Sequence, residues 1–183
     1  MPITSTSEID KLIHAVQAAS DRTVKSLRDL ISNESDSLQV LRLMKFSEIG
    51  HHPTDGRKLN IIEQVNQTFT YLVSLDAAKW VLQTHPELLP AGINVNLGTA
   101  AGFDLESVEA GVMAAEVFAA TNPRSNDKLR KDIVRLAEKA ADYKHRYVFF
   151  SCTGFGTGRQ TALETVSGIQ VWSFSVEHLL KAA

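Results

Sequence analysis

In the N-terminal half of the chain, hydrophobic residues recur at three- and four-residue steps, which predicts amphipathic helices. The first helix covers residues 7–32, the second about 36–48 and the third about 58–84. The third helix is expected to end before Pro86, because the residue that precedes a proline avoids the helical region. The apolar stripe of the first two helices must be buried, either against the rest of this chain or against a partner subunit.

The pattern then changes from a helical to a strand-like period. Apolar and polar residues alternate over 93–97 and over 103–108, and a short apolar run at 112–120 favours a buried strand. A charged helix is expected at 126–144, followed by a core strand at 147–152. The remaining elements are expected to be a glycine-rich loop at 153–158, a short helix near 159–166, a strand at 169–174 and a final helical turn. This order predicts an α/β fold in which helices pack on a mixed sheet.

Composition and charge narrow the class of protein. A chain of 183 residues suits one domain with a substantial core. The net charge of −2 excludes a wholly basic nucleic-acid binder but allows a local basic face. The single cysteine, Cys152, excludes an intrachain disulfide, and no stretch has the length and apolar composition of a membrane span. With no secretory signal at the N-terminus, a soluble, cytoplasmic protein is expected.

Charged residues are distributed unevenly along the chain. Residues 63–116 contain seven acids and one base, whereas residues 124–146 contain eight bases and four acids. An acidic cluster beside a basic helix suits a metal-dependent phosphodiesterase, because acids hold Mg²⁺ and bases hold phosphates. A helix that is merely solvated on its charged outer face is the alternative interpretation.

Glu116 is the residue on which the functional interpretation depends. It lies in the middle of the apolar run, and a buried carboxylate costs several kcal/mol unless a cation, a basic partner or protonation compensates. A turn at 109–111 would bring Asp104 toward Glu116, and two close carboxylates repel each other unless a divalent ion lies between them. The alternative is an ion pair with a basic side chain such as Arg124.

These segments together resemble the core of the PD-(D/E)XK nucleases. A helix with Glu63, a hairpin with Asp104 and Glu116, a basic helix and a core strand follow that family's αβββαβ order over residues 58–152. The resemblance implies an α/β protein with a restriction-endonuclease-like αβββαβ core.

The rest of the chain would extend this core within a single domain, 1–183. Residues 7–48 would form an N-terminal helical layer, and residues 153–183 would supply a C-terminal loop, strand and helix. The N-terminal helices would also suit the contact of a homodimer, which would place two active sites on the two strands of a DNA duplex.

The resemblance also implies a reaction, the metal-dependent hydrolysis of DNA phosphodiester bonds. Asp104 and Glu116 would bind Mg²⁺ or Mn²⁺, with the backbone carbonyl of Val117 as a further ligand. Glu63 would be an accessory acid on the first core helix.

Phe118 departs from the family pattern, because the family usually has a lysine at this position that stabilises developing negative charge. Lys128 or Lys131 on the following helix could replace that lysine. Without such a replacement, the chain would be a catalytically inactive nuclease-fold protein that binds nucleic acid or a protein partner. Arg124, Lys128, Lys131 and Arg159 are the residues expected to contact DNA phosphates.

Three other features have alternative interpretations. The glycine-rich loop Gly154–Gly158 follows an apolar strand, which suits either a phosphate-binding turn of an enzyme for a phosphorylated ligand or a DNA-contacting loop. His51, His52 and Asp55 could form a metal cluster, but a surface loop is favoured because adjacent histidines seldom converge. Cys152 is expected to be a buried structural residue rather than a nucleophile.

Overall fold

The computed structural model describes residues 2–98 and 101–180. The α-helices are α1 (Thr6–Asn33), α2 (Ser37–Phe46), α3 (Ile61–Thr84) and α4 (Lys128–Lys139). The strands are β1 (Gly50–His51), β2 (Lys58–Leu59), β3 (Ile93–Val95), β4 (Leu105–Ser107), β5 (Met113–Ala119), β6 (His145–Ser151), β7 (Gly158–Arg159) and β8 (Ile169–Ser173). The short 3-10 turns are η1 (Pro86–Leu88), η2 (Ser125–Asp127), η3 (Thr161–Leu163) and η4 (Glu177–Leu179).

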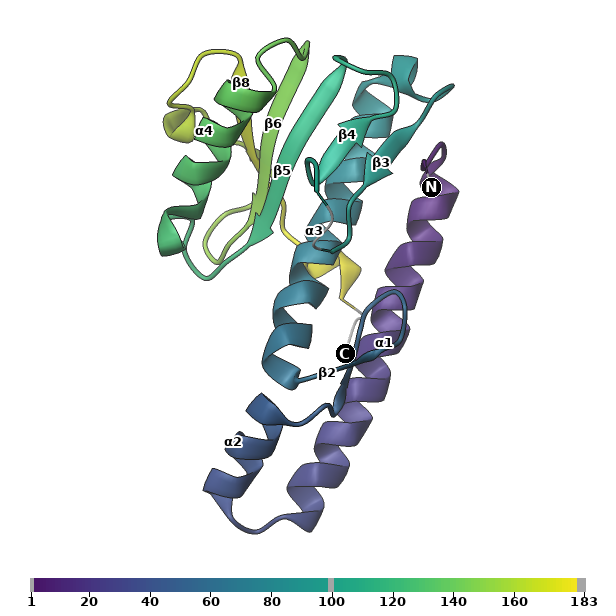
Figure 1. Cartoon of the computed structure of the whole chain (residues 1–183), viewed down its shortest axis with the longest axis vertical. Helices are drawn as coiled ribbons and strands as arrows, with labels where there is room; N and C mark the ends of the chain where they lie inside the picture. Colours follow the sequence, from purple (N-terminus) through teal and green to yellow (C-terminus); the bar gives the residue numbers. More distant parts are fainter. Residues whose placement is uncertain (1, 99–100, 181–183) are drawn as a thin grey trace.

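A mixed sheet forms the centre of the molecule, with α4 on one face and α3 on the other (Figure 1). Its strand order is β3-β4-β5-β6-β8-β7. Strands β3, β4 and β5 are antiparallel neighbours, whereas β5, β6 and β8 run parallel to one another. The parallel step from β5 to β6 requires a crossover, and α4 supplies it. The mixed α/β fold that the sequence predicts is therefore confirmed.

The side chains of β5 alternate between the two faces of the sheet. Met113, Ala115 and Val117 pack into the core that α3 covers. Ala114 and Phe118 pack into the smaller core beneath α4. Glu116 points to the same face of the sheet as Ala114 and Phe118, and it forms an ion pair with a residue of α4. The predicted strand at 112–120 is thus a central strand, buried over nearly its whole length.

Several element boundaries differ from those expected. The helix expected at 126–144 is shorter at both ends: Asn126 and Asp127 take left-handed φ values of 53° and 57° before α4 begins, and α4 ends at Lys139. Asn and Asp tolerate this conformation better than other non-glycine residues. The short helix expected near 159–166 is wrong in part: Arg159 pairs with Trp172 in strand β7, and only a 3-10 turn follows.

The N-terminal helices form an arm that extends beyond the sheet (Figure 1). Helix α1 packs along α3 through one buried row, which contains Ile9, Ile13, Val16, Ala19 and Thr23. Helix α2 has no buried residue, and the first turns of α3 expose apolar side chains as well. None of the described helices is long and apolar enough to cross a membrane.

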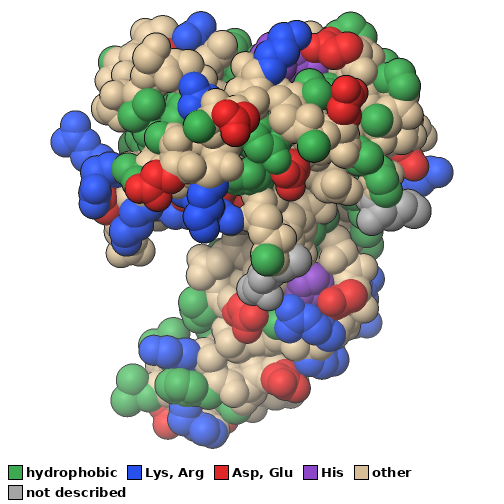
Figure 2. Space-filling model, turned by 45° about the horizontal axis from the view of Figure 1, so that its top comes forward, with side chains coloured by type: hydrophobic (Ala, Val, Ile, Leu, Met, Phe, Trp, Pro, Cys, Tyr) green, Lys and Arg blue, Asp and Glu red, His purple; other side chains and the backbone are tan. Residues whose placement is uncertain are grey.

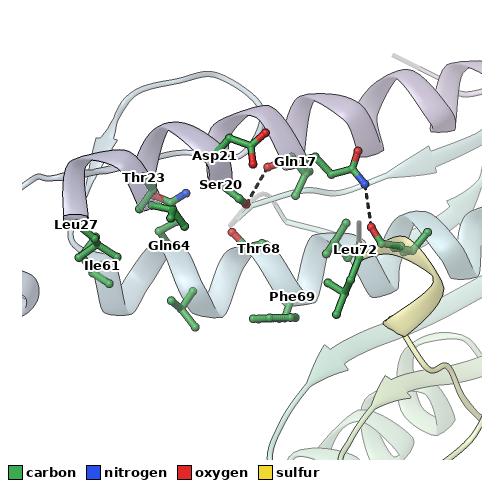
Figure 3. A pocket seen from close by; sticks show the side chains of 15 residues that line it. Gln17, Ser20, Asp21, Thr23, Leu27, Ile61, Gln64, Thr68, Phe69 and Leu72 are labelled. Atoms are coloured by element: carbon green, nitrogen blue, oxygen red, sulfur yellow. Dashed lines mark hydrogen bonds between the residues drawn. The ribbon is translucent and has the colours of Figure 1, made fainter. Parts of the chain in front are cut away.

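A cavity of about 340 Å³ lies between α1 and α3, and its lining is mostly apolar (Figure 3). The C-terminal segment reaches this cavity, where the side-chain amide of Gln17 donates a hydrogen bond of 2.8 Å to the carbonyl of Leu179. Phe69 and Val24 on its rim are 40% and 44% exposed. The apolar stripe of the N-terminal helices is therefore buried against this chain only in part.

Candidate active site

Asp104 and Glu116 lie beside each other at the point where β4 begins to pair with β5. Asp104 directly precedes β4, and its Oδ2 accepts a hydrogen bond of 2.7 Å from the backbone N–H of Val117. This bond holds the Asp104 carboxylate next to the strand position that follows Glu116. The glutamate itself is only 1% exposed, as expected for an acid within a central strand.

The basic helix α4 supplies the cation that compensates Glu116. Nη1 of Arg135 donates a hydrogen bond of 3.0 Å to Oε2 and lies 2.8 Å from Oε1. Nη2 of the same side chain donates to the carbonyl of Gly102, in the loop before Asp104. The basic partner that the sequence suggested, Arg124, is instead exposed in the loop before α4.

A second buried acid, Asp132, faces the same cluster from α4. It is 3% exposed, and its Oδ1 accepts a hydrogen bond of 2.6 Å from Nζ of Lys128, one helical turn earlier. Asp132 lies on the inner face of the helix, beside Ile133 and within one turn of Leu129. Three carboxylates and two cations are thus gathered beneath α4.

The electrostatics of this cluster disfavour full ionisation of its acids. The pKa of Glu116 is raised to about 8, first by burial and then by the charge of Asp104, whereas Arg135 acts in the opposite direction. Burial also raises the pKa of Asp132 to about 6, although Lys128 opposes this change. An added cation would therefore stabilise the ionised form of both carboxyl groups.

Two buried carboxylate oxygens in the cluster accept no hydrogen bond within the described chain. They are Oε1 of Glu116, which touches Arg135 without a well-directed bond, and Oδ2 of Asp132. Unsatisfied buried oxygens are uncommon, because each one forfeits its interaction with water. Carboxylate oxygens are also the ligands that Mg²⁺ prefers, and it usually keeps several waters beside one or two carboxylates. Asp104 and Glu116, with Asp132 nearby, therefore fit the ligand chemistry of such an ion.

Phe118 occupies the position where the resembled family usually has a lysine. Its side chain is 4% exposed and stacks on Phe150, with ring centroids 5.6 Å apart. This position belongs to the core under α4. Among the residues expected to replace that lysine, Lys128 lies in the cluster, whereas Lys131 is exposed and donates to the carbonyl of Asn126.

Glu63 lies apart from the carboxylate cluster. It occupies the first turn of α3, the helix that covers the opposite face of the sheet, and it is exposed. Its side chain accepts a hydrogen bond from Gln67, one turn later on the same helix. The structure therefore does not bring the proposed accessory acid together with Asp104 and Glu116.

The expected phosphate-binding residues are dispersed. Lys and Arg side chains gather on the side of the molecule formed by α4, which carries Lys128, Arg130, Lys131, Arg135 and Lys139 (Figure 2). Arg159 lies instead on the edge strand β7, where its guanidinium makes two hydrogen bonds, of 2.7 and 2.9 Å, to the carboxylate of Glu164.

The glycine-rich loop lies between β6 and β7. Gly154 has a φ of 86°, and a Cβ on Gly154 or Gly156 would meet nothing within 4 Å, so the loop is open to solvent. It is tied to the sheet by Ser173, whose hydroxyl donates a hydrogen bond of 2.5 Å to the carbonyl of Gly156. A ligand at this loop stays a prediction.

The histidine pair at 51–52 and Cys152 are the two remaining features that the sequence singled out, and both are held by packing contacts. His51 and His52 have different partners: His51 interacts with Lys58, whereas the buried His52 interacts with Tyr71 and Asp55. The two rings therefore do not converge on one ion, although His52 is buried rather than on the surface.

Cys152 is 8% exposed, and burial raises the pKa of its thiol. This agrees with the structural role expected of it.

Arg135 and Asp132 are the site residues that sequence reasoning missed. A signal for Asp132 was present, because it stands among the apolar residues of the inner face of α4. Arg135 had no such signal, since several basic residues of α4 could have paired with Glu116.

Comparisons with protein-family models, curated proteins and solved structures found no match to this chain. Any assignment of function must therefore be argued from the chemistry of the site.

Proposed function

We propose that this chain is a metal-dependent nuclease of the PD-(D/E)XK type, which hydrolyses phosphodiester bonds of DNA. One observation carries the proposal: the hydrogen bond from the Val117 N–H to Asp104 holds that carboxylate beside the buried Glu116. The element order supports it, because α3, β3, β4, β5, α4 and β6 follow each other as in the resembled αβββαβ core.

Asp104 and Glu116 would hold Mg²⁺ or Mn²⁺ in this nuclease. When bound, the ion supplies a Lewis acid for the phosphate and lowers the pKa of an attacking water. With an ion held there, Glu116 would no longer depend on Arg135 as its counter-charge. The guanidinium would then be free to contact a phosphate oxygen of the substrate.

Lys128 would perform the role of the missing lysine. Its ammonium group is held by Asp132 at 2.6 Å, at the side of the cluster that α4 forms, and its side chain is 43% exposed. A cation in this position can stabilise the negative charge that develops on a phosphate in the transition state. With Arg124, Lys131 and Arg159, it would also contact the DNA backbone.

Cleavage of a supercoiled plasmid in Mg²⁺ or Mn²⁺ tests this proposal. We expect Asp104→Asn and Glu116→Gln to lower the rate by about 10²-fold or more, and Lys128→Met to lower it by a similar factor. Glu138→Gln is the matched control, because Glu138 is an exposed acid on the same helix. Cleavage that persists in Asp104→Asn and Glu116→Gln would refute the assignment.

A catalytically inactive DNA-binding protein is the second candidate. Two observations favour it: Phe118 is packed in the core, and Arg135 already satisfies part of the Glu116 charge. In that case no metal would support cleavage. DNA binding would be retained in Glu116→Gln and weakened in Lys128→Met.

We also propose that two copies of this chain associate through the N-terminal helices, so that a duplex meets two sites. Leu38, Leu41 and Phe46 of α2 are 77%, 61% and 71% exposed, which is unusual for three apolar residues of one short helix. Light scattering should report a dimer that Leu41→Glu disrupts and Ser37→Glu leaves intact. A monomeric wild-type chain would contradict this arrangement.

A further inference from the structure

Two histidines and a glutamate meet at the edge of the sheet where β6 begins. His85 caps the C-terminal end of α3, Glu87 lies in the 3-10 turn directly after it, and His145 is the first residue of β6. One nitrogen or oxygen atom from each residue lies within 4.8 Å of the other two. Among the described residues, this is the one group of its kind.

The distances within this group are those of a metal site that is nearly assembled. Nδ1 of His85 lies 3.3 Å from Oε1 of Glu87, and this oxygen lies 3.9 Å from Nε2 of His145. A tetrahedral Zn²⁺ with bonds of about 2.0–2.1 Å holds its ligand atoms roughly 3.3 Å apart. Small side-chain rotations would therefore bring all three atoms to bonding distance of one ion.

One buried atom of the group has no hydrogen-bond partner among the residues that the structure describes. Nε2 of His145 is buried and makes no hydrogen bond among the described residues. Nδ1 of His85, in contrast, lies within hydrogen-bond distance of Glu87. Imidazole nitrogens are the commonest metal ligands in proteins, so a buried ring nitrogen without a hydrogen-bond partner is a candidate ligand.

Tyr147 supplies the outer support that metal-binding histidines usually have. Its hydroxyl lies 2.8 Å from Nε2 of His85, so this nitrogen can donate to Tyr147 and leave Nδ1 free to bind an ion. The ring of Tyr147 also stacks against the ring of His145, with an interplanar angle of 9°. Both imidazoles are thus held in place by the core that α3 covers.

We infer that His85, Glu87 and His145 form a binding site for a zinc-class divalent cation, separate from the carboxylate cluster beneath α4. Two nitrogen ligands and one carboxylate suit Zn²⁺ or Co²⁺, whereas Mg²⁺ prefers oxygen ligands alone. Three protein ligands leave a fourth position for water or another small ligand. The site also joins the end of α3 to the start of β6, so an ion bound there would stabilise the fold.

Calorimetric titration of Zn²⁺ into the full chain, stripped of metal with a chelator, tests this inference. We expect one ion per chain for the wild type and affinity at least tenfold weaker for Glu87→Gln and His145→Gln. His14→Gln is the matched control, since His14 is exposed on α1. Co²⁺ should give the visible absorption of a tetrahedral complex in the wild type and the control, and lose it in the other two variants.

Glu87→Gln keeps the result interpretable, because the Glu87 side chain is 48% exposed and its replacement leaves the core packing unchanged. A wild-type chain that binds no Zn²⁺ would overturn the inference. Variants with folded circular-dichroism spectra that bind Zn²⁺ as tightly as the wild type would also overturn it. Zinc binding without any DNA cleavage would refute the proposed nuclease and leave this site intact.

Discussion

The two faces of the central sheet are built from the same strands, but one face is packed with apolar side chains and the other contains buried charges. Beneath α3, successive inward side chains of β5 and β6 are apolar or aromatic, and the polar histidine group lies only at the rim. Beneath α4, the strands place Glu116 among apolar residues, and the helix adds Asp132 with Arg135 and Lys128. The α3 face contributes mostly hydrophobic stabilisation. The α4 face retains buried charges that reduce stability, which is typical of functional sites.

The covering helices explain this difference. Helix α3 has 24 residues and buries side chains from several directions, whereas the 12 residues of α4 present a single narrow apolar row between charged ones. The charged side chains of α4 compensate Glu116, but they occupy space that apolar side chains fill on the α3 face. The comparison predicts that equivalent substitutions on the two faces have unequal effects.

The largest effect is expected from truncation of adjacent aromatic residues on β6. Phe149 and Phe150 are both fully buried, but Phe149 faces α3, where its ring contacts Trp80, Tyr147 and Phe174. A buried Phe→Ala change costs about 3–5 kcal/mol, with the larger cost where the surroundings cannot collapse. We therefore expect Phe149→Ala to lower the free energy of unfolding more than Phe150→Ala does.

Urea unfolding of both variants measures this difference. Phe46→Ala on the exposed α2 is the control and should change stability by about 0.5 kcal/mol or less. An equal or larger loss in Phe150→Ala would show that the α4 face is packed as well as the α3 face.

A smaller effect, of a few kcal/mol, is expected in the pH dependence of stability. The pKa of Glu116 is 4.5 in the unfolded chain and about 8 in the folded protein, so the folded state binds more protons between these values. Its contribution to stability is complete below about pH 4.5 and is lost as the pH rises through about 8. Each unit of this interval corresponds to about 1.4 kcal/mol.

Unfolding free energies of wild type and Glu116→Gln, measured between about pH 6 and pH 8, check this prediction. The wild type should lose stability relative to the variant over this range. Above about pH 6 the contribution of Asp132 is largely lost already, so the remaining change with pH reports Glu116. Glu138→Gln should follow the wild type. Parallel curves for Glu116→Gln and wild type would mean that Arg135 keeps the carboxylate ionised throughout.

The order of helices and strands was predictable because it depends on local pattern. The helical period correctly located α3, the alternation located β3 and β4, and the apolar run located β5. The proline after His85 correctly ended α3. The predicted ends of elements were wrong where the backbone conformation, rather than the hydrophobic pattern, determines where the element begins or ends. Left-handed residues before α4 shorten that helix, and pairing with β8 makes Arg159 part of a strand.

For the carboxylate cluster and the histidine group, the sequence predicted only those features that depend on a single element or on two adjacent ones. The burial of Glu116 followed from its apolar neighbours, and its proximity to Asp104 followed from a hairpin. The choice of Arg135 as partner depends on how α4 packs, which no local pattern encodes. The metal-binding group brings together His85 and His145, which are 60 positions apart in the sequence. The only local feature that marks either histidine is the end of α3 at His85.

The next prediction concerns Mg²⁺ binding by the carboxylates on the α4 face of the sheet. Because Glu116 must lose its proton to bind an ion, we expect Mg²⁺ affinity to rise by up to tenfold per pH unit until about pH 8. Calorimetry in buffers of different ionisation enthalpy should detect the released proton. Glu116→Gln should bind Mg²⁺ weakly and without pH dependence. Affinity that is constant with pH would separate Glu116 from the ion.

The smallest effect concerns Arg159, at the far edge of the sheet from β3. Its guanidinium is engaged by Glu164 through two hydrogen bonds, so a phosphate would have to compete with that carboxylate. We expect Arg159→Ala to weaken DNA binding by less than about tenfold and to reduce the salt dependence by about one ion at most. Lys128→Met should have the larger effect, because Lys128 lies on the basic helix beside the carboxylates. Fluorescence anisotropy at several salt concentrations measures both quantities. A greater loss in Arg159→Ala than in Lys128→Met would move the DNA surface from α4 to the β7 edge and, with it, the importance of the glycine-rich loop.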